Sequence, residues 1–476
     1  MKPNWQLWVV CILACLAIGV YGFGYNPGFS RALAQASMDA GNNAKLLAAS
    51  EAMPTDQMII KYKPSAAAYR PGSLIAPDGA EQMARLSSAA ATQLSYLRAM
   101  SGGAHVLQMK SRLPMEQVLA ISKRLSSLPE VEYANPDTML SPALTPNDPR
   151  YPDQWNYYQT YGINAPAAWD ITTGSANIVV AVVDTGITNH TDLNGRMLPG
   201  YDFISDSNSA NDGTGRDNNP SDPGDWITIS ESENVYGYFY GCPVQDSSWH
   251  GTHVAGTIGA ASNNGSGVTG INWNSKILPV RVLGKCYSYL SDAEDGMRWA
   301  AGLAVPGVPA NPYPANVLNL SFGGVGWCSV STQNTINAIL ATGAVVVTAA
   351  GNENGSARDF TPGSCSGVIT VAATNRQGSR AFYSNYGTQV EISAPGGEWS
   401  ITNDPNSILS TANSGPSTPA ADTYLYYQGT SMAAPHISGV VSLMLSVDAN
   451  RTPAEILAIL QETARSFPAG STCTTA

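Results

Sequence analysis

The sequence predicts an α/β protein with a mainly parallel sheet that helices cover on both faces. Four continuous apolar runs, each flanked by Gly or Asn, are predicted to be buried strands, at 178–183, 317–320, 344–348 and 368–372. Helical patterns lie among and after them, at 291–302, 333–342 and 431–447. Strands that are apolar on both sides and alternate with helices are typical of a parallel sheet with two covered faces.

A smaller α+β domain is predicted ahead of this part. Its expected elements are strand 58–62, helix 80–100, strand 105–109, helix 115–127 and strand 131–134. Two β-α-β units of this size make a ferredoxin-like domain. The proline-rich stretch 142–152 separates the two parts. We therefore expect a small domain at 56–143 and a large one at 144–476.

The first residues have the pattern of an export signal. Lys2 supplies positive charge, Leu7 to Gly24 is an apolar run, and Ala32 to Ala36 offers small residues for cleavage. We expect residues 1–36 to be a signal peptide, 37–55 to be a flexible segment, and the product to be secreted. A retained membrane anchor is the alternative, because the apolar run is near the minimum length for a span.

Charge is scarce and unevenly distributed. Lys and Arg number 24 against 35 Asp and Glu, so nothing indicates nucleic-acid binding. Residues 1–144 hold 12 basic and 9 acidic side chains, whereas residues 145–476 hold 12 and 26. A basic leader joined to an acidic body predicts that the two parts attract each other.

The seven cysteines suit an exported protein. Cys11 and Cys15 fall in the signal, and Cys242, Cys286, Cys328, Cys365 and Cys473 remain. None shows C-x-x-C spacing, so disulfides are favoured over metal ligation. Order along the chain favours Cys242 with Cys286 and Cys328 with Cys365, although four cysteines allow three connectivities. We expect the partner of Cys473 to lie beyond residue 476, in a chain that stops short.

Three segments each place a reactive side chain at the end of an expected element. Asp184 ends a buried strand in AVVDTGI, where a carboxylate can hold an imidazole in one tautomer. His250 opens a helix of small residues in HGTHVAG. Ser431 begins a helix in GTSMAAPH, where helix N-terminal N–H groups can stabilise an oxyanion. Singly these are a turn residue, a structural His and a helix cap, but their joint occurrence predicts a catalytic triad.

A fourth segment completes the predicted site. Asn352, in AAGNENG, follows the buried strand 344–348. Its side-chain amide is placed to donate to an oxyanion, and removing such a donor typically costs about 2.7 to 4 kcal/mol of transition-state stabilisation. A turn-forming Asn is the structural alternative.

These four segments resemble those of the subtilases, the subtilisin-like serine peptidases, over roughly residues 144–476. The resemblance implies a three-layer α/β/α sandwich. It implies that Asp184 orients His250, that His250 is the general base and then the acid, and that Ser431 is the nucleophile. Asn352 and the Ser431 N–H would form the oxyanion hole. The related sedolisins carry Glu and Asp where this chain has His250, and are rejected.

The resemblance also assigns roles outside the triad. Residues 56–140 are similar to the inhibitor-type propeptide, which assists folding and blocks the active site, and autocleavage is expected between Met139 and Asn147. Extended substrate would pair beside 321–324, facing 286–290. The walls of the pocket for the residue before the scissile bond would be Ser321, Phe322, Gly323, Ala350, Gly351 and Asn352, with Glu353 at the rim.

Structural Ca²⁺ is expected at two places. Oxygen-rich loops suit this ion, and the acidic candidates in the segment 205–226 are Asp212, Asp217, Asp222 and Asp225; a solvated acidic loop is the alternative. By resemblance, Asp148, Asp192 and Asn264 fall where subtilases place calcium ligands. His250 and His253 do not have the spacing of a zincin zinc site.

The sequence thus predicts a secreted, monomeric serine endopeptidase that forms an acyl-enzyme and is activated by propeptide removal. Its substrates would be proteins and peptides, cut with broad specificity and a preference for large apolar residues. A catalytically silent binding protein and an esterase on the same scaffold are the competing hypotheses.

Overall fold

The computed structural model describes residues 55–63, 79–138, 144–401, 403–471 and 473. The expected signal peptide and most of the flexible segment after it therefore lie outside the described residues. The chain divides into two compact units, Met1–Ser141 and Pro142–Ala476, and each is described by itself.

The smaller unit is a four-stranded antiparallel sheet with two helices, in the sheet order β2-β3-β1-β4. Its elements are β1 Thr55–Tyr62, α3 Ala80–Ala90, β2 Leu94–Ala99, η1 Ser101–Gly103, β3 Ala104–Leu113, α4 Met115–Ser126 and β4 Val131–Pro136. Side chains from β1, β3 and both helices, such as Ile60, Leu107, Leu86 and Val118, fill one core. This β-α-β-β-α-β order is that of a ferredoxin-like domain.

The helix expected over 80–100 is wrong in its second half. It ends at Ala90, because Ala91 adopts a left-handed conformation with φ 53° and its N–H bonds back to the Ser88 carbonyl. The chain then turns into β2, which pairs with β3. Leu94 and Leu97 are three residues apart, a spacing that is typical of one face of a helix; in β2, Leu94 is buried and Leu97 is exposed.

The larger unit is built on a seven-stranded sheet in the order β13-β12-β10-β8-β5-β7-β6. All neighbouring pairs are parallel. The strands are β5 Val179–Asp184, β6 Tyr201–Asp202, β7 Lys276–Arg281, β8 Val317–Leu320, β10 Val345–Ala349, β12 Ile369–Thr374 and β13 Ile392–Pro395. The four strands expected from apolar runs are β5, β8, β10 and β12.

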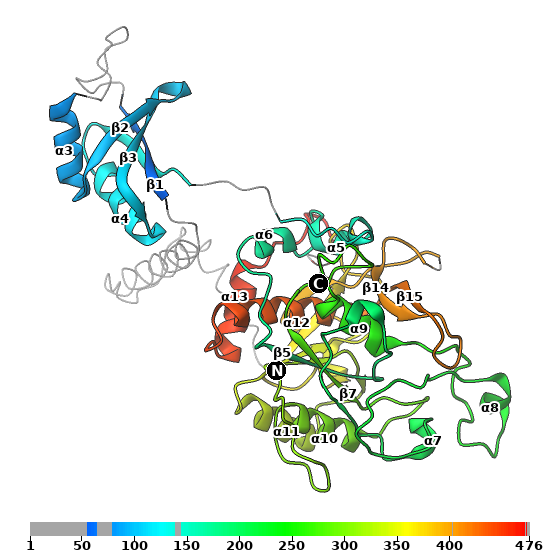
Figure 1. Cartoon of the computed structure of the whole chain (residues 1–476). Helices are drawn as coiled ribbons and strands as arrows, with labels where there is room; N and C mark the ends of the chain where they lie inside the picture. The colour runs from blue at the N-terminus through cyan, green and yellow to red at the C-terminus, as the bar shows by residue number, and fades with distance from the viewer. Residues whose placement is uncertain (1–54, 64–78, 139–143, 402, 472, 474–476) are drawn as a thin grey trace, which may run out of the picture. The chain divides into compact units, whose positions relative to one another are not determined.

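Helices cover both faces of this sheet, which confirms the three-layer sandwich (Figure 1). On β5, Val180 and Val182 pack with residues of α9 and α12, whereas Ala181 and Val183 pack with residues of α10 and α11. The alternation explains why the strand is apolar throughout. The helices are α9 His250–Gly259, α10 Leu290–Ala300, α11 Val330–Leu340, α12 Thr430–Val447 and α13 Pro453–Thr463.

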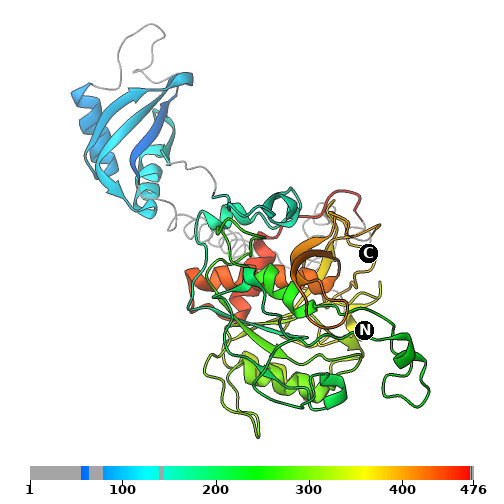
Figure 2. The ribbon, with the colours of Figure 1, turned by 45° about the vertical axis from the view of Figure 1, so that its right-hand side comes forward.

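Shorter elements surround the sandwich. They are η2 Tyr151–Asp153, α5 Trp155–Tyr158, α6 Ala165–Trp169, η3 Thr191–Leu193, α7 Ser207–Ala210, α8 Ile229–Glu233 and η4 Ala357–Asp359, with the antiparallel pairs β9 Gly324–Val325 with β11 Phe360–Thr361 and β14 Ile408–Asn413 with β15 Asp422–Tyr427. The loop that carries α8 projects from the unit in both views (Figures 1 and 2). Among the described residues, α12 is the one helix long and apolar enough to cross a membrane, and 72% of it is buried in the core.

Candidate active site

The carboxyl ends of three neighbouring strands define the site. β5 ends at Asp184, β8 is followed by Ser321, and β10 leads into the loop with Asn352. In parallel α/β sheets, ligands bind at this edge. The helices α9 and α12 bring His250 and Ser431 to it.

Asp184 and His250 form a direct pair. His250 Nδ1 lies 2.7 Å from Asp184 Oδ1, and the carboxylate is fully buried while the imidazole is 22% exposed. The backbone N–H of Thr185 also donates to Asp184 Oδ1. The start of α9 can lie this close to the loop after β5 only because residue 251 is glycine. A Cβ on Gly251 would lie 2.2 Å from the Gly186 carbonyl oxygen. The aspartate thereby fixes the orientation of the imidazole, with Nδ1 turned to the carboxylate.

Burial and the neighbouring carboxylates shift the pKa of His250 in opposite directions. Burial alone would lower the pKa of His250, but the Asp184 carboxylate opposes this effect, with further help from Asp225 and Asp222, and the pKa is raised above its ordinary value. Asp222 is itself affected: burial, and then the charge of Asp225, raise its pKa to about 7. Three carboxylates thus favour the charged form of the imidazole, and of these Asp184 contacts it directly.

Ser431 is the second residue of α12, and its side chain is partly exposed. Its Oγ donates to the Ser321 carbonyl oxygen at 2.9 Å, and within the described residues no hydrogen bond joins it to His250. Catalytic hydrogen bonds of this kind are often unformed without substrate. Asp184, His250 and Ser431 therefore lie at the carboxyl ends of the same strands. The hydrogen bond between Asp184 and His250 is formed, whereas the one between Ser431 and His250 is not.

The Ser431 backbone nitrogen and the Asn352 side-chain amide lie close to one point beside Gly429. A Cβ built on Gly429 would lie 3.6 Å from the Ser431 backbone nitrogen and 3.8 Å from both Nδ2 and Oδ1 of Asn352. Asn352 Oδ1 accepts from the Thr430 N–H at 2.9 Å and from Thr430 Oγ1 at 3.0 Å. These bonds fix which end of the amide faces Thr430, so Nδ2 is left to donate elsewhere. A helix N-terminal N–H and a side-chain amide in this arrangement suit an oxyanion.

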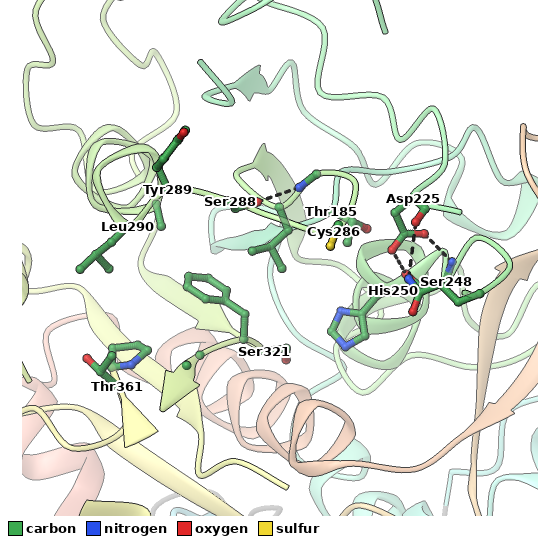
Figure 3. A pocket seen from close by; sticks show the side chains of 18 residues that line it. Thr185, Asp225, Ser248, His250, Cys286, Ser288, Tyr289, Leu290, Ser321 and Thr361 are labelled. Atoms are coloured by element: carbon green, nitrogen blue, oxygen red, sulfur yellow. Dashed lines mark hydrogen bonds between the residues drawn. The ribbon is translucent and has the colours of Figure 1, made fainter. Parts of the chain in front are cut away.

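A cavity of about 530 Å³ extends away from His250. His250 and Asp225 form one end of it, and Tyr289 and Leu290 lie at the opposite side (Figure 3). The full lining is Thr185, Asp225, Gln245, Ser248, His250, Leu283, Gly284, Cys286, Ser288, Tyr289, Leu290, Ala293, Ser321, Phe322, Gly323, Gly324, Thr361 and Pro362. Both segments expected to flank extended substrate, 286–290 and 321–324, thus contribute to its walls.

The remaining predicted pocket residues lie elsewhere. Ala350, Gly351, Asn352 and Glu353 do not line the cavity. The Glu353 carboxylate accepts a 2.6 Å hydrogen bond from Asn385 Nδ2, and the same amide donates to the Ala350 carbonyl. Glu353 is therefore held by Asn385 beside Gly351.

Both expected disulfides are present. Cys242 pairs with Cys286, and Cys328 pairs with Cys365. The first ties the loop after α8 to the cavity wall, because Cys286 is one of the lining residues. Cys473 is free within the described residues.

The structure brings together the three calcium candidates expected from the family resemblance. Asp148 accepts from the backbone N–H groups of Asn263 and Asn264, and Asp192 accepts from Asn264 Nδ2 and the Val268 N–H. Both carboxylates are 2% exposed. Burial raises the pKa of each, and the charge of Asp148 further raises the pKa of Asp192. Two buried, mutually repelling carboxylates are oxygen ligands of the kind that Ca²⁺ takes, whereas the Asn264 amide turns Nδ2 toward Asp192 and its Oδ1 accepts from the Ser266 N–H.

The four acidic candidates of the segment 205–226 do not converge. Asp212 pairs with Arg281 at 3.1 Å, and Asp217 accepts from Thr214 and Asn219. Asp222 accepts from Thr185 instead, and Asp225 from Ser248. No group of three or more His, Cys, Asp or Glu side chains that could hold a metal occurs in the part of the chain described. Asp225 instead lines the cavity, Asp222 accepts from the cavity residue Thr185, and Asp212 forms an ion pair with Arg281.

Comparison with known proteins agrees with this geometry. The model of the subtilase family matches residues 175–474, which is more than half of the chain. The chain belongs to the subtilase family. This subtilase is 46% identical over 377 residues to an extracellular protease of Xanthomonas campestris pv. campestris, covering 79% of this chain and 62% of the relative. It is 42% identical over 421 residues to an extracellular basic protease of Dichelobacter nodosus, covering 86% and 67%.

A solved structure is similar as well. A chain described as proteases from Pseudoalteromonas arctica PAMC 21717 superposes with a TM-score of 0.66 and 53% identity, covering 69% of this subtilase and 95% of that chain. This likeness confirms the subtilisin-like fold. The subtilase spans about two thirds of the length of the two curated relatives above, or slightly less.

Sequence reasoning missed several residues that the cleft uses. Gln245, Ser248, Thr361 and Pro362 line the cavity, but none belongs to a motif around the triad. The sequence predicts Asp225 only as a metal ligand. The signal is the density of acidic residues between β6 and α9, which does not indicate which of these residues faces the cleft.

Proposed function

We propose that this subtilase is a serine endopeptidase that cuts peptide bonds through an acyl-enzyme. The 2.7 Å contact between His250 Nδ1 and Asp184 Oδ1 carries the proposal. With Nδ1–H donated to the aspartate, Nε2 is the basic nitrogen and faces the cleft side of the ring. It takes the proton of the Ser431 hydroxyl as that oxygen attacks the substrate carbonyl carbon.

The later steps of peptide hydrolysis use groups that lie at the same carboxyl end of the parallel sheet. The carbonyl oxygen becomes an oxyanion, which the Ser431 N–H and Asn352 Nδ2 stabilise. His250 then gives its proton to the departing amine, and the peptide C–N bond breaks. In the second half, His250 takes a proton from water, the resulting hydroxide attacks the acyl carbon, and Ser431 regains its proton.

Substrate recognition depends mainly on backbone pairing. An extended peptide can lie between the segments 321–324 and 286–290, which line the cavity. Backbone pairing does not distinguish side chains, so we expect broad specificity. A preference for large apolar residues before the scissile bond stays a prediction.

Maturation is part of the same proposal. Residues 1–36 act as a signal peptide for secretion, which the extracellular relatives support. The ferredoxin-like unit acts as a propeptide that assists folding and inhibits the enzyme until it is removed. The slow folding of parallel sheets gives a physical reason for such a template, and the opposite net charges of the two parts favour their association.

A Ca²⁺ ion is proposed at Asp148, Asp192 and Asn264. Its charge would offset the repulsion between the two buried carboxylates and so stabilise the loop 263–268 against the segment before η2. The role is structural, because these residues are distinct from those of the catalytic cleft.

Labelling by a fluorophosphonate probe tests the catalytic assignment. The probe should modify Ser431, and Ser431→Ala should abolish labelling, casein hydrolysis and release of the smaller unit. Ser446→Ala, on the same helix and away from the cleft, is the matched control and should retain all three. Labelling that survives Ser431→Ala would overturn the assignment. Hydrolysis of esters without hydrolysis of casein would identify an esterase instead, and neither activity in a labelled protein would favour a binding role.

A further inference from the structure

The residue before the catalytic histidine has an unusual backbone conformation. Trp249, which precedes α9, has φ 49° and ψ 33°, in the left-handed region. A bulky side chain is rarely found there, because its Cβ crowds the backbone. Such strain persists only where the surroundings hold the residue, and it is most common at active sites. His250 is the next residue, so whatever holds this turn also places the catalytic imidazole.

Hydrogen bonds from three distant segments hold the turn. The Ser248 N–H and Oγ donate to the two carboxylate oxygens of Asp225, at 2.6 and 2.8 Å (Figure 3). The buried Trp249 indole donates to the Gly415 carbonyl at 2.8 Å. The Tyr427 hydroxyl donates to the Ser248 carbonyl, also at 2.8 Å. The Tyr427 bond is thus made to the peptide group that joins Ser248 to Trp249, whose orientation sets the backbone angles of the turn.

Tyr427 also belongs to the segment that leads to the nucleophile. It is the last residue of β15, and Ser431 follows four residues later as the second residue of α12. The tyrosine ring stacks on the imidazole of His253, with centroids 4.4 Å apart and an interplanar angle of 12°. His253 lies one turn after His250 on α9. Tyr427 therefore joins the segment that carries Ser431 to the helix that carries His250 at two points.

The groups in this contact keep one protonation state while His250 titrates. Burial and the charges of two carboxylates raise the pKa of Tyr427 to about 12, so its hydroxyl stays protonated and can donate. Burial lowers the pKa of His253 to about 3, so this ring stays neutral. Its Nε2 lies 3.1 Å from the carbonyl oxygens of Ile408 and Leu425. Carbonyls only accept, so Nε2 carries the proton and ties α9 to both strands of the hairpin.

We infer that Tyr427 is a positioning residue, which sets the separation of Ser431 and His250 through its hydrogen bond to Ser248. The inference rests on the proposed function and deepens it. Tyr427 does not line the cavity, so its hydroxyl acts on the catalytic pair and not on substrate. The hydrogen bond between Ser431 and His250 is not formed here and must form during reaction. A small displacement of either group makes that approach less frequent.

Replacing Tyr427 by Phe removes the hydroxyl and keeps the ring that stacks on His253. The substrate is a chromogenic peptide with Leu before the scissile bond, and kcat is expressed per site titrated by the fluorophosphonate. Tyr427→Phe should lower kcat by about 5- to 10-fold, near the upper end of what one hydrogen bond contributes, and leave KM within about twofold. A purely structural role would reduce the number of titrated sites but not the kcat of each. Tyr426→Phe, at the next residue of β15 but in a different apolar cluster, is the matched control and should keep the parent kcat.

A second substitution tests whether Tyr427 acts through the turn. Ser248→Ala removes the bond from Ser248 Oγ to Asp225 and keeps the carbonyl that Tyr427 bonds. Because both bonds hold one segment, the double variant should lose more kcat than the product of the two single losses. An unchanged kcat in Tyr427→Phe, a change confined to KM, or single losses that only multiply would overturn the role of Tyr427 and leave the proposed function intact. A parent that neither reacts with the fluorophosphonate nor cleaves the peptide would instead overturn the proposed function, and this inference with it.

Discussion

Ser431 and Ser321 are joined by two reciprocal hydrogen bonds. Ser431 Oγ donates to the Ser321 carbonyl oxygen at 2.9 Å, and Ser321 Oγ donates to the Ser431 carbonyl oxygen at 2.8 Å. The pair ties the first turn of α12 to the end of β8. For reaction, the Ser431 hydroxyl must turn away from Ser321 towards His250, while the second bond keeps its backbone in place.

Replacing Ser321 by Ala removes the second bond, together with the bond that Ser321 Oγ accepts from Asn319 Nδ2 at 2.8 Å, and keeps the backbone that is expected to pair with substrate. A neutral hydrogen bond contributes about 0.5 to 1.5 kcal/mol net, so kcat should fall by about 2- to 10-fold, with KM within about twofold. Steady-state kinetics on one Leu peptide measures both. A raised KM with unchanged kcat would show that Ser321 serves substrate binding rather than placement of the nucleophile.

Asn352→Ala should lower kcat by about 100- to 1,000-fold and leave KM nearly unchanged, because the lost donor acts on the oxyanion and not on bound substrate. Asn354→Gly, in the same loop, is the control; Asn354 has φ 51°, which glycine adopts readily. A loss of kcat no larger than that of the control would exclude Asn352 from the oxyanion hole.

Asp225→Asn should shift the acid limb of the pH profile to lower pH. The negative charge of Asp225 helps to raise the pKa of His250. The active form has a neutral His250, so activity rises as pH increases through that pKa, and removing the charge lowers it. The measurement is kcat/KM against pH on an uncharged peptide. Asp153→Asn, at an exposed carboxylate outside the cleft, should leave the profile in place; a shift of the Asp225→Asn profile to higher pH would contradict the argument.

His436 should make the fold less stable in acid. Burial lowers its pKa to about 4, whereas the unfolded chain binds a proton near pH 6.5. The unfolded state therefore holds more protons between pH 6.5 and 4, and stability falls as pH drops through this window, by up to about 3 kcal/mol from this residue. Asp222, with its pKa raised to about 7, acts in the opposite direction.

The comparison that isolates His436 uses urea unfolding of Ser431→Ala, which cannot digest itself. Between pH 7 and pH 5, adding His436→Gln should make the loss of stability smaller than in the Ser431→Ala parent. An equal loss in both proteins would show that His436 does not remain neutral in the folded state.

Excess EDTA should lower the melting temperature of Ser431→Ala, and added Ca²⁺ should restore it, because ion binding stabilises the folded state. Asp192→Asn should remove most of the response. Asp212→Asn should keep it, since Asp212 is paired with Arg281. No shift with EDTA in the parent would count against the site.

The sequence was most informative where chemistry and local structure coincide. Apolar runs predicted β5 and β8 because both faces of each strand are covered, and the motifs around Asp184 and His250 predicted a contact that the structure contains. Interactions between distant segments could not be predicted in this way. Nothing near Asp212 in the sequence indicates that Arg281, 69 residues later, would take its carboxylate. Tyr427 likewise reaches Ser248 only through folding.

The covalent link from Cys242 to Cys286 has a consequence for where this protein can mature. It anchors the projecting loop to the wall of the cleft, and it can form only in an oxidising compartment. A chain made in a reducing cytosol would keep that wall untethered even with its triad complete. The choice of expression host, and of an oxidising compartment within it, therefore determines whether the recovered protein has its native cleft.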